Sequence, residues 1–287
     1  MDLAAHETAV PAAVEYPDGR VTKPITIPQL SARKRSGEKI TMLTAYDATM
    51  ARLLDRAGID VLLVGDSLGT VILGCDTTLP VTLDAIVHHT RAVKNGTSRA
   101  LIVADMPFLT YQVSAAETVR NAGRLLQEGG AAAVKMEGGA AIADMVKRLV
   151  AIGIPVMGHV GLTPQSVHQL GGFRSFGKRP EEAEKVAEDA RQLERAGAFA
   201  VVLESVPSTL AAAITAELKI PTIGIGAGPD CDGQVLVSYD AFGLFDAFVP
   251  KFVKQYAKLG EAVTEAAKEY IAEVQSGQFP GPEHSSR

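Results

Sequence analysis

The sequence is poor in cysteine: Cys75 and Cys231 are the only two among 287 residues, and no Cys-x-x-Cys pair occurs. The first twenty residues also lack the basic start and apolar core of a secretory signal peptide. A disulfide framework is therefore disfavoured. Both cysteines are expected to be free thiols in a reducing compartment.

Long apolar runs and basic tracts are missing as well. No apolar run approaches the roughly 20 residues that span a bilayer, and no Lys/Arg-rich stretch is interleaved with aromatic residues. The formal net charge is −5 and the isoelectric point is about 5.7, so nothing attracts a phosphate backbone. We therefore expect a globular, soluble, cytoplasmic protein that binds neither nucleic acid nor membrane.

The dinucleotide-binding fingerprint is also absent. The glycine-rich stretch at residues 223–229 has its glycines at positions 224, 226 and 228, which does not fit Gly-x-Gly-x-x-Gly. A Rossmann-type nucleotide site is therefore disfavoured. At the end of a strand, such a stretch could instead let a flat ligand or a phosphate approach the backbone.

What the sequence does contain is a series of short apolar runs that end in polar residues. The clearest is DVLLVGDS at residues 60–67, which is typical of a strand buried on both faces of a parallel sheet. Similar or weaker runs lie at residues 41–47, 100–105, 131–137, 155–159, 200–204, 221–226 and 246–253. Their alternation with helical stretches predicts a (β/α)₈ barrel, although an open doubly wound sheet shares much of this pattern. Acids recur at the strand ends, which favours the barrel because closure brings such ends together.

The length matches one barrel domain with short extensions. We expect a flexible tail at residues 1–23, a single barrel domain at 24–276 that ends in a helix, and a frayed tail at 277–287. A helix at residues 27–36 is expected to cover the barrel floor. The loop at 68–80 is either a lid or interface segment or a passive connection.

Seven residues near the predicted strand ends are candidates for chemistry: Asp66, Ser67, Asp105, Lys135, Glu137, His159 and Glu204. Residues i and i+2 of a strand share a face, so Lys135 and Glu137 point the same way. Several carboxylates at one barrel mouth repel one another, which favours a divalent cation or a protonated carboxyl group. An all-oxygen ligand set suits Mg²⁺ or Mn²⁺. The competing interpretation is that each acid caps a helix or pairs with a lysine, and that His159 bonds a backbone group.

Longer motifs resemble those of a known family. They are TAYD at residues 44–47, LVGDSLG at 63–69, LPVTL at 79–83, VADMPF at 103–108, VKMEGG at 134–139, MGHVGLTPQS at 157–166 and TIGIGAGPDCDGQ at 222–234. In this order they are similar to the motifs of the ketopantoate hydroxymethyltransferases. The resemblance runs from about residue 27 to residue 252, and only the two tails depart from it.

The resemblance implies a (β/α)₈ barrel of the phosphoenolpyruvate/pyruvate type in the pathway to pantothenate and coenzyme A. Enzymes of this family transfer a hydroxymethyl group from 5,10-methylenetetrahydrofolate to 3-methyl-2-oxobutanoate, giving 2-dehydropantoate. The positions matching the family's Mg²⁺ site are Asp66, Asp105 and Glu137, those matching its substrate site are Asp66, Ser67, Asp105 and Lys135, and Glu204 matches its catalytic base. His159 is an accessory candidate. Family members form homo-oligomers that are decamers, and the same assembly is implied here.

These residue types suit the implied reaction. A 2-oxo acid can chelate Mg²⁺ through its carboxylate and keto oxygens, which makes its C3–H more acidic. Glu204 is expected to remove that proton, and the resulting Mg²⁺-stabilised enolate attacks the methylene carbon carried by folate. Lys135 and Ser67 are expected to hold the substrate carboxylate.

Three other functions use the same residues. A metal-dependent oxo-acid lyase or mutase of the same barrel type would need no folate. A Schiff-base aldolase would use Lys135 as its nucleophile, although the acids beside that lysine should keep it charged. A non-catalytic binding or scaffold barrel would leave its strand-end acids without chemistry, which is rare in this fold.

Overall fold

The computed structural model describes residues 14–15, 21–172 and 174–285. The chain divides into two compact units, Met1–Val235 and Leu236–Arg287. Most of the flexible tail expected at residues 1–23 lies outside the described residues. The described parts of that stretch are two short antiparallel strands, β1 (Val14–Glu15) and β2 (Val21–Thr22).

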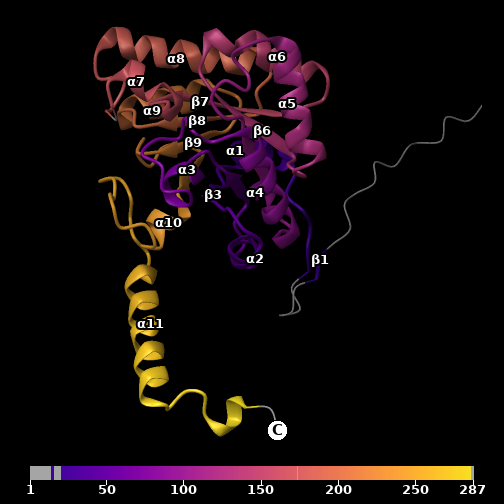
Figure 1. The fold of residues 1–287 in the computed structure, drawn as a ribbon. Coiled ribbons are helices and arrows are strands. Elements are labelled where there is room, and N and C mark those ends of the chain that lie inside the picture. Colours follow the sequence, from indigo (N-terminus) through magenta and orange to yellow (C-terminus); the bar gives the residue numbers. More distant parts are fainter. Residues whose placement is uncertain (1–13, 16–20, 173, 286–287) are drawn as a thin grey trace, which may run out of the picture. The chain divides into compact units, whose positions relative to one another are not determined.

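The first unit is built on a closed barrel (Figure 1). Within the described residues, the barrel strands follow the order β10, β3, β4, β5, β6, β7, β8 and β9 around the ring. Their bounds are β3 (Ile40–Thr44), β4 (Val61–Val64), β5 (Leu101–Asp105), β6 (Ala133–Glu137), β7 (Val156–Gly161), β8 (Ala200–Glu204), β9 (Thr222–Ile225) and β10 (Gly233–Leu236). Neighbouring strands pair in parallel, for example Val134 of β6 with Val156 of β7. The predicted (β/α)₈ barrel is therefore confirmed, and the open doubly wound sheet is excluded.

Helices link the strands and surround the barrel (Figure 1). They are α1 (Ile27–Ser36), α2 (Ala48–Ala57), α3 (Leu68–Val71), α4 (Leu83–Gly96), α5 (Ala115–Gln127), α6 (Ala143–Ala151), α7 (Val167–Leu170), α8 (Pro180–Arg195) and α9 (Ser208–Glu217), with 3₁₀ turns η1 (Ala140–Ile142) and η2 (Pro164–Ser166). Polar caps start several of them: the Ser114 hydroxyl accepts a hydrogen bond from the Glu117 backbone at the start of α5. None of the helices in the described part of the chain combines the length and apolarity needed to cross a bilayer.

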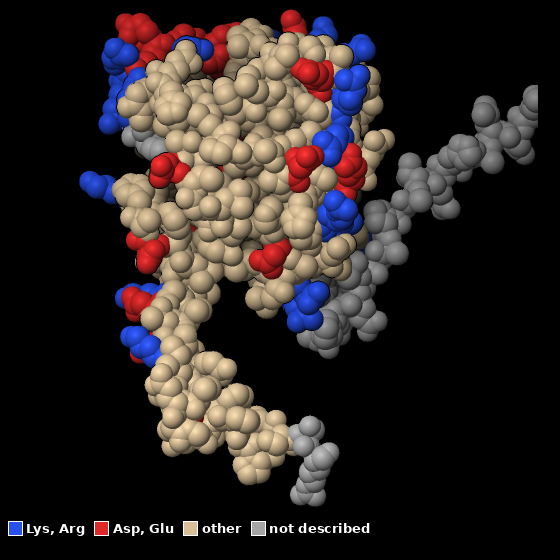
Figure 2. Space-filling model, in the orientation of Figure 1, with Lys and Arg blue, Asp and Glu red and all other residues tan. Residues whose placement is uncertain are grey.

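The outer face of α8 is strongly charged. Arg191 lies 2.9 Å from Glu184, 3.1 Å from Glu188 and 2.6 Å from Glu217, whereas Leu193 on the other side of the helix is buried. Figure 2 shows acidic and basic side chains mixed at the top of the view, where α8 lies in Figure 1. This pattern agrees with a helix that covers the barrel on one side and faces solvent on the other.

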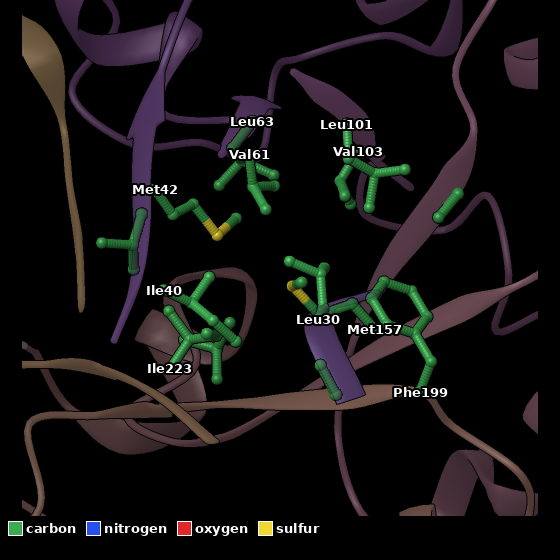
Figure 3. Packing of buried hydrophobic residues seen from close by; sticks show 14 of the residues in the cluster. Leu30, Ile40, Met42, Val61, Leu63, Leu101, Val103, Met157, Phe199 and Ile223 are labelled. Carbon is green, nitrogen blue, oxygen red and sulfur yellow. The ribbon is translucent and has the colours of Figure 1, made fainter. Parts of the chain in front are cut away.

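The starts of the barrel strands enclose the apolar core (Figure 3). Ile40, Val61 and Leu101, near the starts of their strands, pack in one cluster with Leu30 of α1, which is 1% exposed. In Figure 3, Leu30 lies among side chains that come from several different strands. The expected helix at residues 27–36 is confirmed, and it covers the barrel floor by inserting this leucine.

The eighth strand is not where the sequence predicts it. The strand expected at residues 246–253 is wrong, because the barrel closes instead through β10, the short segment GQVL (Gly233–Leu236). The 246–253 segment contains Pro250, which has no N–H for a strand ladder, and its Phe248 side chain is 69% exposed. The pattern of apolar residues does not predict β10, because a four-residue strand that begins with glycine carries little strand signal.

Gly233 is needed for barrel closure. A Cβ atom at this position would lie 2.5 Å from the backbone oxygen of Ile40 and 2.7 Å from the Ile223 side chain. The neighbouring Asp232 backbone oxygen accepts a hydrogen bond from the Ile40 N–H at 2.9 Å. Only glycine lets the two backbones approach this closely.

The second unit contains α10 (Ser238–Ala241), α11 (Leu259–Ser276) and the 3₁₀ turn η3 (Pro282–His284). No residue of α11 is buried within the described chain, and Val263, Tyr270 and Ile271 expose 62%, 57% and 51% of their surface. The decamer implied by the family resemblance stays a prediction.

We expect Gly233→Ala to lower the free energy of unfolding by about 1–3 kcal/mol, because the added methyl group overlaps the Ile40 backbone. Gly123→Ala is the matched control: its Cβ meets nothing within 4 Å in the middle of α5, so it should be neutral or stabilising. Urea denaturation of both variants measures the difference. Equal stability of the two would contradict the role assigned to Gly233.

Candidate active site

The carboxyl end of β4 contributes the first predicted site residues. Asp66 is 5% exposed, and its backbone N–H donates to Asp105 Oδ2 at 2.9 Å. Ser67 Oγ lies 2.8 Å from the hydroxyl of buried Tyr46. The turn depends on Gly65, whose Cβ would lie 2.9 Å from Ser67 Oγ and 3.4 Å from Asp105 Oδ2. The absence of a side chain at position 65 therefore lets these polar groups come together.

Asp105 and Lys135 form a buried ion pair between adjacent strands. They are direct partners in the β5–β6 register, and Lys135 Nζ lies 2.9 Å from Asp105 Oδ1. Both side chains are almost fully buried, because Lys135 is 6% exposed and Asp105 is 3% exposed. The contact geometry leaves Oδ1 without a hydrogen bond, so this oxygen has an ion-pair partner only.

Glu137, His159 and Glu204 extend the site across the next two strands. Glu137 pairs with His159 in the β6–β7 register, and Glu137 Oε1 lies 3.4 Å from His159 Nδ1. On the other side of the imidazole ring, His159 Nε2 lies 3.2 Å from Glu204 Oε2. The Glu204 side chain is 15% exposed, against 4% for Glu137, so Glu204 is the more accessible of these acids.

Two residues that the sequence analysis did not single out complete the cluster. Gln165, in η2, donates from Nε2 to Asp66 Oδ2 at 2.8 Å and from its backbone N–H to Glu137 Oε2 at 2.9 Å. The Tyr111 hydroxyl lies 2.8 Å from Gln165 Oε1. Gln165 is part of the motif at residues 157–166. The sequence offered one signal for Gln165, which is its position directly after Thr163-Pro164, a pair typical of a helix start.

The carboxylates of the cluster outnumber its cations. Burial, together with the charges of Asp105 and Glu137, raises the pKa of Asp66 to about 8. Burial also raises the pKa of Asp105, although Lys135 opposes this effect. For Glu137 the balance is reversed: burial raises its pKa, but His159, Lys135 and the Gln165 backbone outweigh burial and keep the pKa below its usual value. Asp66 and Asp105 thus differ from Glu137, because burial outweighs the compensating charges at both aspartates.

Both cations of the cluster stay charged at neutral pH. Burial lowers the pKa of Lys135, but Asp105, Glu137 and Asp66 outweigh it and raise the pKa above its usual value. Burial and Lys135 also lower the pKa of His159, yet Glu137 and Glu204 raise it to about 9. A charged Lys135 is a poor nucleophile, which argues against the Schiff-base alternative.

The donor set of the cluster fits a hard divalent cation. Its oxygens are carboxylates, and these four groups outnumber the two cations, Lys135 and His159. Among the residues that the structure describes, no three His, Cys, Asp or Glu side chains form a ready-made metal site. Mg²⁺ keeps several waters or substrate oxygens in its coordination shell, so its protein ligands need not form a closed cage before the ion binds.

The structure brings all seven sequence-predicted residues to the carboxyl ends of the barrel strands. Their contacts differ from the competing interpretation of isolated helix caps, since only Asp105 pairs with a lysine. The glycine-rich stretch after β9 is different. A Cβ at Gly224 would lie 3.0 Å from Cys231 Sγ, and one at Gly228 would lie 2.4 Å from Ser208 Cβ. At Gly224, which lies in β9, and at Gly228, chain atoms therefore pack closely against the glycine backbone, and a ligand at this stretch stays a prediction.

A closed barrel with acids, a lysine and a histidine buried at the carboxyl ends of its strands defines a (β/α)₈-barrel enzyme. Similar folds occur in a phosphonopyruvate hydrolase solved with oxalate and Mg²⁺ (TM-score 0.59, 14% identity, 91% of this chain and 93% of that chain). They also occur in a 2,3-dimethylmalate lyase of the PEP mutase/isocitrate lyase superfamily (TM-score 0.55, 17% identity, 91% of each chain). At these identities the likeness concerns the fold alone.

The family follows from closer relatives. The model of the ketopantoate hydroxymethyltransferase family matches residues 24–282. The 3-methyl-2-oxobutanoate hydroxymethyltransferase of Moorella thermoacetica is 60% identical over 261 residues, which is 91% of this chain and 97% of that protein. The enzyme of the same name from Syntrophus aciditrophicus is 58% identical, over 91% of this chain and 96% of that protein. The chain belongs to the ketopantoate hydroxymethyltransferase family and is an enzyme of the hydroxymethyltransferase class.

In metal-free protein, we expect Asp66→Asn to raise the free energy of unfolding, increasingly so as the pH rises toward 8. The folded carboxyl group keeps its proton up to a pKa of about 8, against 3.8 for the ordinary group. Wild-type protein therefore loses stability as the pH rises through this window, whereas asparagine has no proton to lose. The gain at about pH 8 should be on the order of a few kcal/mol.

Urea denaturation in EDTA, at about pH 5 and about pH 8, measures this effect. Asp76→Asn, at an exposed position, controls for the general effect of removing one negative charge. A stability difference between Asp66→Asn and wild type that is the same at both pH values would contradict the raised pKa.

Proposed function

We propose that the chain transfers a hydroxymethyl group from 5,10-methylenetetrahydrofolate to 3-methyl-2-oxobutanoate, giving 2-dehydropantoate for pantothenate and coenzyme A synthesis. The observation that carries the proposal is the connected set of buried charges at the barrel mouth, found in a chain whose relatives have this activity in their names. A metal-assisted reaction at an oxo acid needs such a set, because it must bind an anion and remove a proton from carbon in one place.

Asp66, Asp105 and Glu137 are the proposed Mg²⁺ ligands. The excess of carboxylates over cations supports this assignment. When bound, Mg²⁺ would withdraw charge from the keto group of the substrate and so make its C3–H more acidic.

Lys135 and Ser67 are proposed to hold the substrate carboxylate. Asp66 and Asp105 are the other two residues of the proposed substrate site. The charge of Lys135 supports this role, and so does the Tyr46 hydroxyl 2.8 Å from Ser67 Oγ. A hydrogen bond donated by Tyr46 to Ser67 leaves the serine proton available for an anion. Held in this way, the substrate has a defined orientation at the barrel mouth.

Glu204 is proposed to remove the C3 proton, after which C3 attacks the methylene carbon carried by folate. The two C–N bonds of that carbon break, water supplies the hydroxyl group, and tetrahydrofolate leaves. Its exposure of 15% is compatible with contact to a bound substrate, and His159 Nε2 lies 3.2 Å from its Oε2. This proximity supports an accessory role for His159, which would orient the Glu204 carboxylate.

The proposal predicts that turnover of 3-methyl-2-oxobutanoate requires methylenetetrahydrofolate, disappears in EDTA and returns with Mg²⁺. Product formation measured by chromatography, with each component omitted in turn, tests this. Turnover that is indifferent to EDTA would keep the reaction and reject the metal site. Conversion of the oxo acid without folate would favour the lyase or mutase alternative.

Glu204→Gln is expected to slow exchange of the substrate C3 proton with solvent deuterium by about 10²–10⁴-fold, because the amide cannot accept that proton. Proton NMR of 3-methyl-2-oxobutanoate with enzyme and Mg²⁺ in D₂O measures the exchange rate. Glu181→Gln, at an exposed position on α8, should exchange at the wild-type rate. Exchange at the wild-type rate in Glu204→Gln would assign the base to another residue.

A further inference from the structure

Gln165 holds parts of the site with both polar atoms of its side-chain amide and with its backbone N–H. It is 5% exposed. The side-chain nitrogen donates to Asp66 Oδ2 at 2.8 Å and to the Met106 backbone oxygen at 3.0 Å. Its side-chain oxygen lies 2.8 Å from the Tyr111 hydroxyl, and its backbone N–H donates to Glu137 Oε2 at 2.9 Å. One residue thus connects two acids that stand at the ends of β4 and β6.

The orientation of the Gln165 side chain is specified by its partners. Met106 offers only a carbonyl oxygen at this contact, and the Tyr111 hydroxyl donates to Gln165 Oε1 at 2.8 Å, a shorter contact than the one with the Glu137 backbone oxygen at 3.0 Å. If the amide were flipped, its oxygen would face the Met106 backbone oxygen, and an acceptor–acceptor contact would result. The NH₂ group must therefore face Asp66.

Asp66 has a particular need for this donor. Its backbone N–H donates to Asp105 Oδ2 at 2.9 Å, and its own Oδ2 accepts from Gln165 Nε2 at 2.8 Å. Without the amide, this buried oxygen would lose its donor, and the side chain could turn away from Glu137. The amide opposes that rotation with a hydrogen bond whose direction Tyr111 and Met106 determine.

We propose that Gln165 is a positioning residue, which holds the Asp66 and Glu137 carboxylates in the relative arrangement that Mg²⁺ binding requires, with Tyr111 orienting its amide. This inference rests on the proposed metal site. Hydrogen-bonded partners of metal ligands orient those ligands, and their loss commonly weakens metal binding. The Gln165 side chain holds Asp66, whereas its backbone N–H holds Glu137. Substitutions of the side chain therefore test the positioning of Asp66.

Mg²⁺ binding without substrate is the direct test, measured by calorimetry on wild type, Gln165→Leu, Tyr111→Phe and the double variant. Gln165→Leu should bind Mg²⁺ about 10- to 100-fold more weakly. Tyr111→Phe should lose less, because the amide keeps Met106 as a partner. The double variant should be no weaker than Gln165→Leu, since the hydroxyl then has no amide to orient. Gln192→Leu, on α8, should bind Mg²⁺ as wild type does.

A purely structural role is distinguished by kinetics. Loss of folded enzyme lowers the maximal rate alone, whereas loss of positioning raises the Mg²⁺ concentration for half-maximal rate and leaves the KM for methylenetetrahydrofolate unchanged. If Gln165→Leu does not fold, weaker Mg²⁺ binding by Tyr111→Phe supports the proposal, and wild-type binding by it rejects the proposal.

The outcomes separate this inference from the proposed function. Wild-type Mg²⁺ affinity in a folded Gln165→Leu variant would overturn the positioning role while the metal site stands. A wild-type protein that binds no Mg²⁺ would overturn the metal site itself, and the positioning role with it.

Discussion

The candidate site depends on an imbalance of buried charge. Four carboxylates meet two cations at the barrel mouth, and the pKa of Asp66 rises to about 8 because burial and its acidic neighbours disfavour its charge. Such a cluster weakens the fold unless a ligand adds positive charge, since unpaired buried charges are costly. The same imbalance that destabilises the metal-free protein is therefore what would attract a divalent cation and hold an anionic substrate beside Lys135.

The barrel separates stability from chemistry along its axis. The strand starts enclose apolar side chains, and Leu30 of α1 lies among them (Figure 3). The carboxyl ends of the same strands hold the charged residues in register, Glu137 beside His159 and Asp105 beside Lys135. A rigid, well-packed floor allows the other end to keep an arrangement of charges that would not hold itself together.

Neutral residues behind the charged ones give the site its order. Tyr46 contacts Ser67, and Tyr111 contacts Gln165, which in turn donates to Asp66 and Glu137. Because these tyrosines and the glutamine remain uncharged, they direct lone pairs and protons without adding to the repulsion among the acids. Hydrogen-bonded partners of this kind limit the directions in which a carboxylate or hydroxyl can turn.

The sequence by itself determined the barrel, its floor helix and the seven strand-end residues, because apolar runs and the polar residues that end them are local patterns. It missed β10, whose four residues Gly233–Leu236 carry too little strand signal, and predicted a strand around Pro250 instead. Only the tertiary structure decided that Gln165 meets Asp66, 99 residues away, and Tyr111, 54 residues away. Partners and pKa shifts of this kind arise when barrel closure brings strand ends together, and no local pattern encodes them.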